Sequence, residues 1–214
     1  HSTYTDKYAQ DELTVDPHSS LTGEAANNLL HLSQGISNAS AALGKLVDYF
    51  RNIDEPTVVV FYGDHRPGLG LTNGGTVYSE LGMVPAARSE WSVEQLAGLY
   101  STDYLIWAND AAKAVLGQGF TGTGPTISPC YLMSVLFDCC GWDGPSWMQL
   151  QRQTRAVLPV MQSRGIYLVA QDGAPSADKD VASLTYALEG DALQAEQNYA
   201  IAEYYVRRIH PAKS

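Results

Sequence analysis

Asp64 and His65 are the side chains of this sequence best suited to bind a metal ion. They are adjacent, and they directly follow the apolar run PTVVVFYG, residues 56–63. A carboxylate oxygen beside a neutral imidazole suits a divalent cation such as zinc or manganese. Two ligands do not complete a site, so a second interpretation stays open. In it, Asp64 caps the following turn and His65 is hydrogen-bonded at the edge of a sheet.

The run before this pair predicts the strand that would position it. Residues 58–61 (VVVF) show no polar alternation, which is typical of a central parallel strand buried on both faces. Ligands of such sheets gather at the carboxyl ends of the strands, where Asp64 and His65 fall. Neighbouring residues of a regular strand point to opposite faces. Both could reach one ion only if the chain bends out of the sheet, and Gly63 permits that bend.

Helices are expected to flank this strand. Apolar residues repeat at spacings of 3, 4 and 7 over 22–51, which predicts a long helix with Thr22 as its N-cap. Residues 66–90 contain five glycines and are expected to form a long loop, which is usually functional or mobile. A second apolar strand is expected at 104–108. Further helices are expected at 92–100, 110–116, 129–140, 146–163 (with a break before Pro159) and 191–208, an edge strand at 165–171 and a polar loop at 172–181.

Composition excludes some classes of function. The 214 residues are 45% hydrophobic and carry a net charge of −10, which fits one folded domain. The scattered Lys and Arg residues argue against a nucleic-acid partner, whose binding rests on clustered positive charge. No stretch has the 18 or more consecutive apolar residues typical of a membrane span. Cys130, Cys139 and Cys140 lack metal-ligand spacing and lie in an apolar segment that predicts a buried helix, so three reduced thiols packed in the core are expected.

Three blocks of the sequence together resemble a known family. PTVVVFYGDHRPGLG, LGKLVDYFRNIDEP and STDYLIWANDAAKAVL are similar to the C-terminal half of bacterial phosphoglycerol transferases related to lipoteichoic acid synthase. These enzymes belong to the alkaline phosphatase and sulfatase superfamily. The opening HSTY resembles the end of another segment of that family. The resemblance covers about 1–140 well and 141–214 more weakly, so residues 1–214 are expected to be the C-terminal portion of one catalytic domain.

The resemblance implies a fold and a set of site residues. The fold would be α/β, part of an alkaline-phosphatase-like sandwich with a mostly parallel central sheet flanked by helices. Asp64 and His65 would be metal ligands, with Mn²⁺ as the first choice and Mg²⁺ or Zn²⁺ as alternatives. His1 would contact the substrate phosphate. Arg66 could also bind a phosphate through two hydrogen bonds, although an arginine in a loop is more often a surface charge. Tyr4, Tyr8 and Trp91 could line a lipid or glycerol pocket, although an ordinary structural role is favoured for all three, because tyrosine is abundant in this sequence.

The family's threonine nucleophile and a metal-binding glutamate precede the segment that HSTY resembles. Thr3, Thr5 and Thr22 do not lie in the nucleophile's context, so no catalytic residue is predicted in this chain. Because the sequence starts at His1, we expect that an N-terminal part has been removed, and that the chain alone is inactive.

The resemblance also implies an activity for the parent protein. It would transfer phosphoglycerol from a phosphatidylglycerol-type lipid, whose head group is the substrate, during synthesis of a cell-envelope polymer. The expected location is the extracytoplasmic face of a bacterial membrane, with a membrane anchor upstream. Two alternatives stay open: a fragment of a sulfatase or phosphodiesterase hydrolase, and a folded module without catalytic activity.

Overall fold

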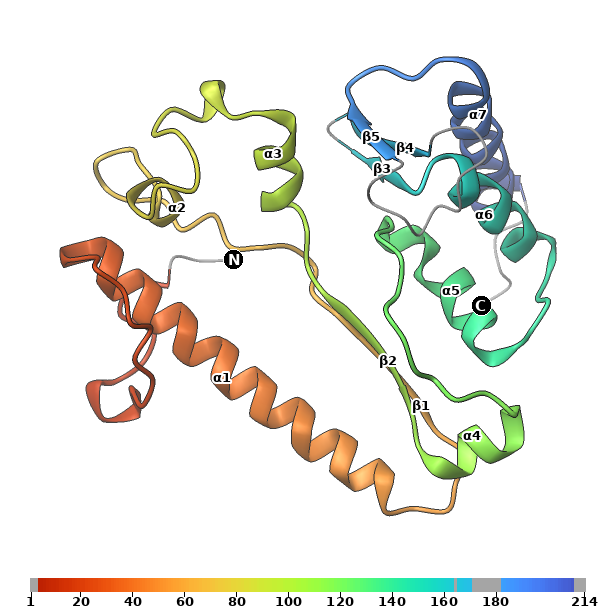
Figure 1. The fold of residues 1–214 in the computed structure, drawn as a ribbon, viewed down its shortest axis with the longest axis horizontal. Coiled ribbons are helices and arrows are strands. Elements are labelled where there is room, and N and C mark those ends of the chain that lie inside the picture. Colours follow the sequence, from red (N-terminus) through yellow and green to blue (C-terminus); the bar gives the residue numbers. More distant parts are fainter. Residues whose placement is uncertain (1–3, 164, 171–181, 210–214) are drawn as a thin grey trace. The chain divides into compact units, whose positions relative to one another are not determined.

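The computed structural model describes residues 4–163, 165–170 and 182–209, and it divides into two compact units, 1–111 and 112–214. We call them the N-terminal and the C-terminal unit. Both combine helices with small sheets (Figure 1), which confirms the predicted α/β class. The N-terminal unit contains α1 (Gly23–Arg51), β1 (Val58–Tyr62), α2 (Val77–Glu80), α3 (Val93–Leu99), β2 (Tyr104–Ala108), the start of α4 (Asp110–Leu116) and the short 3₁₀ helices Gln10–Glu12 and Arg88–Glu90.

The long helix α1 has the predicted bounds, with Thr22 at its N-cap position. The Thr22 side chain makes no capping hydrogen bond. Glu24 in the first turn instead accepts hydrogen bonds from the backbone N and the Oγ1 of Thr72, the latter at 2.7 Å. These hydrogen bonds lower the pKa of Glu24, because they favour its charged form. They also tie the loop that follows β1 to the start of α1.

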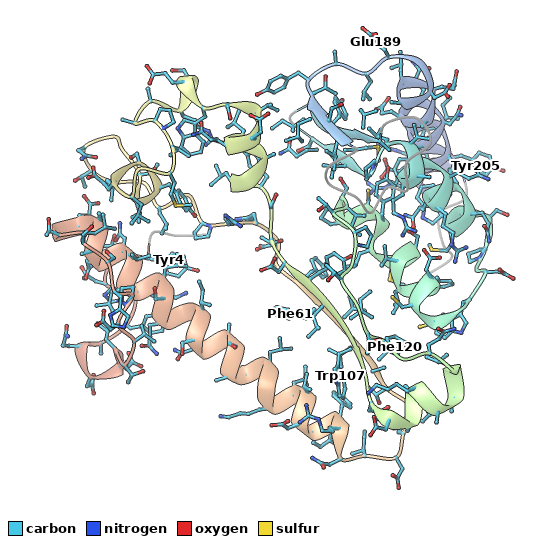
Figure 2. All side chains as sticks on the ribbon, viewed as in Figure 1. Tyr4, Phe61, Trp107, Phe120, Glu189 and Tyr205 are labelled. Atoms are coloured by element: carbon cyan, nitrogen blue, oxygen red, sulfur yellow. The ribbon has the colours of Figure 1, made fainter. Side chains whose placement is uncertain are left out.

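The strands β1 and β2 pair in the antiparallel sense, from Val58 opposite Ala108 to Tyr62 opposite Tyr104. The expectation of a central parallel strand buried on both faces is therefore wrong for β1, and every strand pair in the described ranges is antiparallel. The register puts Phe61 and Trp107 on one face of the two-stranded ribbon, and Figure 2 shows both projecting from the same side. Phe61 is 44% exposed, so the apolar sequence of β1 does not reflect full burial here.

Asn109, directly after β2, fixes the connection between α1 and β1. Its side-chain Nδ2 donates to the carbonyl oxygens of Phe50, Ile53 and Glu55, and its Oδ1 accepts from the backbone N of Thr57 at 3.0 Å. Asn109 is only 1% exposed. One amide side chain therefore satisfies four backbone groups of the turn that feeds the candidate-site strand, as buried polar groups require.

The glycine-rich stretch 66–90 is mostly loop, as predicted, with two short helical segments in it. It contains α2, whose N-cap Thr76 accepts a hydrogen bond from the backbone N of Ser79. Leu69 and Val77 pack with Ala25 of α1 in a small buried cluster. Apolar burial on the first half of α1 therefore anchors this stretch, with Leu21, Leu29, Leu32, Leu71 and Tyr78 packed around the cluster.

The C-terminal unit contains a small sheet in the order β3-β4-β5 beside its helices. The strand predicted at 165–171 is present as β4, but the prediction that it lies at the edge of a sheet is wrong, because β4 lies between two antiparallel partners. The predicted helix 146–163 ends at Val157, since Pro159 cannot continue it. The predicted loop 172–181 lies outside the described residues. The elements are the 3₁₀ turn Pro129–Tyr131, α5 (Leu132–Cys140), α6 (Ser146–Val157), β3 (Val160–Gln162), β4 (Ile166–Ala170), β5 (Ala182–Thr185), α7 (Gly190–Tyr204) and a π turn, Tyr205–Ile209.

A charged cluster joins α5 to α6. The two carboxylate oxygens of Asp138 accept from Arg152 Nε at 2.5 Å and from Arg155 Nη2 at 2.6 Å. Arg152 also donates to the carbonyl oxygens of Trp142 and Asp143. The three cysteines are free thiols, as predicted, but the expected core packing holds for Cys140 alone, because Cys130 is exposed and Cys139 is half-buried. Within the described ranges, no helix combines the length and apolarity that crossing a bilayer would require.

Candidate functional site

The candidate site begins where β1 ends, at Gly63. The ladder continues for one step, because the backbone N of Gly63 donates to the carbonyl oxygen of Asp103 at 3.2 Å. Thr102 Oγ1 donates to the carbonyl oxygen of Gly63 at 2.7 Å. A Cβ atom on Gly63 would lie only 2.9 Å from Thr102 Cβ. Glycine is needed here for close approach to Thr102, whereas the sequence suggested that it was needed for a bend.

Asp64 and His65 contact each other immediately beyond Gly63. The Asp64 Oδ1 accepts a hydrogen bond from the backbone N of His65 at 2.8 Å. The Asp64 Oδ2 lies 3.5 Å from His65 Nε2. The side chains are 69% and 44% exposed, respectively, so solvent reaches both. The first contact matches the turn interpretation of Asp64, and the second brings the two side chains together as the metal interpretation requires.

The carbonyl oxygen of Arg66 selects one tautomer of His65. It lies 3.1 Å from His65 Nδ1. Because a carbonyl oxygen can only accept, Nδ1 carries the proton in this contact. In the neutral ring, Nε2 then holds its lone pair and faces Asp64 Oδ2. A backbone carbonyl on the other ring nitrogen is the usual way in which proteins orient a metal-binding histidine.

The spacing of the two donor atoms also fits a shared cation. An N···O distance of 3.5 Å is longer than a normal hydrogen bond. Two ligands of a tetrahedral ion with bonds of about 2.1 Å stand about 3.4 Å apart. Asp64 and His65 thus fit a divalent ion in donor type and separation. Among the described residues, no group of three or more His, Cys, Asp or Glu side chains could hold a metal ion, so this pair is a partial ligand set.

Arg66 lies at the rim of a pocket beside the pair. Its Nε donates to the carbonyl oxygen of Ser101 at 2.8 Å. The pocket has a volume of about 130 Å³, and Arg66, Tyr78 and Trp91 are among its lining residues. The sequence predicted a phosphate contact for Arg66 but contained no signal for Ser101 or for the pocket. It raised Tyr4, Tyr8 and Trp91 as pocket residues while favouring a structural role for them. Trp91 is both largely buried and part of this lining, whereas Tyr4 and Tyr8 do not line this pocket.

His1, the other predicted phosphate contact, lies outside the described residues. A second Asp–His pair occurs in the same unit, at Asp16 and His18. There the Asp16 Oδ2 lies 3.4 Å from His18 Nδ1, and Asp16 Oδ1 accepts from the backbone N of His18 at 2.9 Å. Sequence reasoning left His18 without a ligand role, and this pair provides an internal comparison for the first.

Residues 1–141 match the family model described as Sulfatase. Over 116 residues the chain is 28% identical to a protein of Rhizobium meliloti (strain 1021) named for cyclic beta-1,2-glucan modification, an alignment that covers 53% of this chain and 16% of that protein. No solved structure gives a significant match.

The matched region ends at residue 141. It therefore includes β1, the Asp64–His65 pair, Arg66 and the pocket beside it. Domains of this family modify sulfate or phosphate esters and are typically metal-dependent, which agrees with a carboxylate and an imidazole placed together at a strand end. The match covers more than half of the chain, and the chain belongs to the sulfatase family of the alkaline phosphatase and sulfatase superfamily.

Proposed function

We propose that this chain forms the metal-binding corner of a phosphoglycerol transferase that acts on a phosphatidylglycerol-type lipid. The observation that carries the proposal is the contact between Asp64 Oδ2 and His65 Nε2, at 3.5 Å, with the His65 tautomer selected by the Arg66 carbonyl. A pair arranged in this way can bind a divalent cation with little rearrangement. Mn²⁺ is the ion we propose, with Mg²⁺ and Zn²⁺ as alternatives.

Each residue has a distinct proposed role. Asp64 and His65 would hold the ion, which when bound would stabilise negative charge on the transferring phosphoryl group. Arg66 has its Nε fixed by Ser101, so its terminal nitrogens are oriented for a phosphate oxygen. His1 is proposed as a further contact to the phosphate. The nucleophilic threonine and a glutamate ligand of the ion would come from sequence outside this chain, because no threonine here lies in their family context.

The name of the relative supports an alcohol as the acceptor. That relative is named for modification of a cyclic glucan, and a sugar hydroxyl is the group of a glucan that can accept an ester, so transfer is the reaction we propose first. We also propose that the reaction takes place on the extracytoplasmic face of a bacterial membrane, in a membrane-anchored protein. We propose residues 1–214 as the C-terminal portion of its catalytic domain, with 1–140 forming the site.

A hydrolase is the second candidate. The family match is compatible with it, since sulfatases hydrolyse sulfate esters. The Asp64–His65 pair would serve either reaction, because a metal-bound ester can be attacked by water or by an alcohol. The two candidates differ in the group that the site recognises, sulfate or glycerol phosphate.

Calorimetry on the Mn²⁺-saturated chain tests the proposal. We expect sn-glycerol 1-phosphate to bind at least about tenfold more tightly than sulfate, because the two anions carry similar charge and only the first has a glycerol group that a phosphoglycerol site would contact. Asp64→Asn should remove the Mn²⁺-dependent part of this binding, whereas Asp16→Asn should leave it intact. Equal affinity for both anions would favour the hydrolase. Identical binding with and without Mn²⁺ would contradict both candidates.

A further inference from the structure

The pocket beside Arg66 is mainly apolar on its inner surface. Met83, Val84, Trp91, Gly98 and Leu99 are among its lining residues. All of these residues lie between β1 and β2 in the sequence, within the N-terminal unit. An apolar pocket next to a polar site usually binds the organic group of a ligand whose reactive group is polar.

The polar side chains of the wall are engaged elsewhere. Each donates to a backbone carbonyl oxygen: Tyr78 Oη to Pro67 at 2.7 Å, Trp91 Nε1 to Pro85 at 2.8 Å, and Gln95 Nε2 to Met83 at 3.2 Å. Gln95 Oε1 also accepts from the backbone N of Ser92. A ligand with many hydroxyl groups would therefore lose hydrogen bonds to water inside the pocket and gain few in return.

Arg66 supplies the one charged group of the lining. Its Nε is bound to Ser101, and its two terminal nitrogens have no hydrogen-bond partner among the described residues. The positive charge of Arg66 also acts on Tyr78: it lowers the pKa of that phenol, while burial, the larger effect, raises it. The guanidinium therefore lies near enough to the pocket for an anion bound to it to direct its organic group inward.

The volume limits the size of that group. About 130 Å³ is close to the cavity of about 150 Å³ that binds benzene in a well-known engineered protein, and it exceeds the roughly 30 Å³ of one water molecule. The pocket can therefore hold one ring or a short alkyl segment. It cannot hold a disaccharide or a complete acyl chain.

We infer that this pocket is a specificity pocket for an anionic ester whose organic group is apolar and about the size of one ring. Arg66 binds the phosphate or sulfate, and Met83, Val84, Trp91 and Leu99 surround the apolar group. In a phospholipid this group is the part of the molecule nearest the acyl chains, and not the hydroxyl-rich glycerol head. As an account of substrate choice, the inference rests on the proposed function of the neighbouring Asp64–His65 pair.

Gly98 offers a direct way to fill the pocket. It lines the pocket within α3, and a Cβ atom added there would meet no atom within 4 Å. Gly98→Leu therefore occupies the space without a backbone clash, and it replaces glycine by a better helix former. Gly44→Leu is the matched control, because Gly44 is also helical, also has nothing within 4 Å of an added Cβ, and does not line the pocket.

Binding is measured by calorimetry or NMR titration on the metal-free chain with three probes. Phenylphosphonate carries both the anion and the ring, methylphosphonate lacks the ring, and phenol lacks the anion. We expect phenylphosphonate to bind about tenfold more tightly than either fragment. Gly98→Leu should reduce its affinity to that of methylphosphonate, and Arg66→Ala should reduce it to that of phenol. Gly44→Leu should bind all three probes as the wild type does.

Equal affinities of wild type for phenylphosphonate and methylphosphonate would overturn the inference, as would unchanged phenylphosphonate binding in folded Gly98→Leu. Circular dichroism of each variant establishes that it is folded. Because the titration uses no metal, its result is independent of the Mn²⁺ experiment. A pocket that binds the ring in a chain that fails to bind Mn²⁺ would support this inference and contradict the proposed function.

Discussion

The N-terminal unit contains two Asp–His pairs with nearly the same separation and very different surroundings. In Asp64–His65 the Oδ2 and Nε2 atoms are 3.5 Å apart, and in Asp16–His18 the Oδ2 and Nδ1 atoms are 3.4 Å apart. In both, the aspartate Oδ1 accepts a hydrogen bond from the backbone N of the histidine. Residue types and distance therefore do not distinguish them.

The two pairs differ in what holds the imidazole. The Arg66 carbonyl oxygen accepts a hydrogen bond from Nδ1 of His65. This contact leaves Nε2 facing Asp64. His18 presents Nδ1 itself to Asp16, at a residue with a left-handed φ of 46° and a side chain that is 87% exposed. The carbonyl oxygen behind the ring, and not the carboxylate in front of it, is therefore what distinguishes His65 from His18.

The largest effect is expected from a substitution of Gly63, where the chain leaves β1 directly before the Asp64–His65 pair. Gly63→Ala places a Cβ 2.9 Å from Thr102 Cβ, so β1 and β2 must separate locally. We expect the free energy of unfolding to fall by about 2 kcal/mol, measured by urea denaturation. Gly68→Ala is the control, with nothing within 4 Å of its added Cβ, and it should change stability by less than about 0.5 kcal/mol. Equal effects of the two substitutions would show that Thr102 simply moves aside.

Metal affinity should separate the two pairs directly. His65→Ala and Asp64→Asn should each weaken Mn²⁺ binding at least about tenfold, because each removes one of two donor atoms. His18→Ala and Asp16→Asn should leave the affinity unchanged. Binding should also weaken as the pH falls, since a protonated imidazole has no lone pair for the ion. Calorimetry on all four variants decides, and equal losses at both pairs would remove the distinction.

The loop behind the first pair depends on Tyr78. Its hydroxyl donates to the carbonyl oxygen of Pro67 at 2.7 Å, and Tyr78→Phe should cost about 1 kcal/mol of unfolding free energy. Burial raises the pKa of Tyr78 in the folded state. The stabilisation by Tyr78 is therefore fully present at pH values below the usual pKa of a phenol, about 10. It is lost as the pH rises through the raised pKa of the folded state.

Denaturation of wild type and Tyr78→Phe at pH 8 and pH 11 measures this effect. The stability difference between the two proteins should shrink at the higher pH. Tyr49→Phe is a suitable control, because Tyr49 is exposed in the same unit and should show no such change. A difference that stays constant with pH would contradict the role given to Tyr78.

The smallest effect is expected when the carboxylate of Asp64 or Asp16 is removed and the free energy of unfolding is measured. Asp64 is 69% exposed and Asp16 is 75% exposed, so alanine at either position should change the unfolding free energy by less than about 0.5 kcal/mol. By contrast, Asp138 in the C-terminal unit bonds two arginines, and Asp138→Ala should cost clearly more. If Asp64→Ala proved as destabilising as Asp138→Ala, the Asp64–His65 pair would be structural.

The sequence predicted the local elements better than their partners. The apolar runs at 58–62 and 104–108 correctly indicated strands, and Pro159 correctly indicated a helix end. The direction of strand pairing was not predictable, because five apolar residues do not encode whether the neighbouring strand runs parallel or antiparallel. The central position of β4 was missed for a similar reason, since its partner β5 reads ASLT and has little apolar character.

The candidate site, like the fold, was predictable only in part. Asp64 and His65 are adjacent and directly follow an apolar strand, so the sequence predicted them as metal ligands. The Arg66 carbonyl that selects the His65 tautomer is a backbone group, and a backbone group has no residue type to recognise. The pocket forms because Trp91 and Gln95 bond to backbone carbonyls ahead of α3. Such tertiary contacts follow from the folded path of the chain and not from residue spacing.

Asn109 also has a consequence for the chemical ageing of the protein. Deamidation would convert its side-chain amide into a carboxylate and remove the donor that now serves Phe50, Ile53 and Glu55. Three carbonyl oxygens would then face a negative charge with almost no water to separate them, because Asn109 is 1% exposed. One slow covalent change of a thermolabile residue type would therefore loosen the turn before β1, the strand that leads to Asp64. An increased mass of the peptide that contains Asn109 would report it.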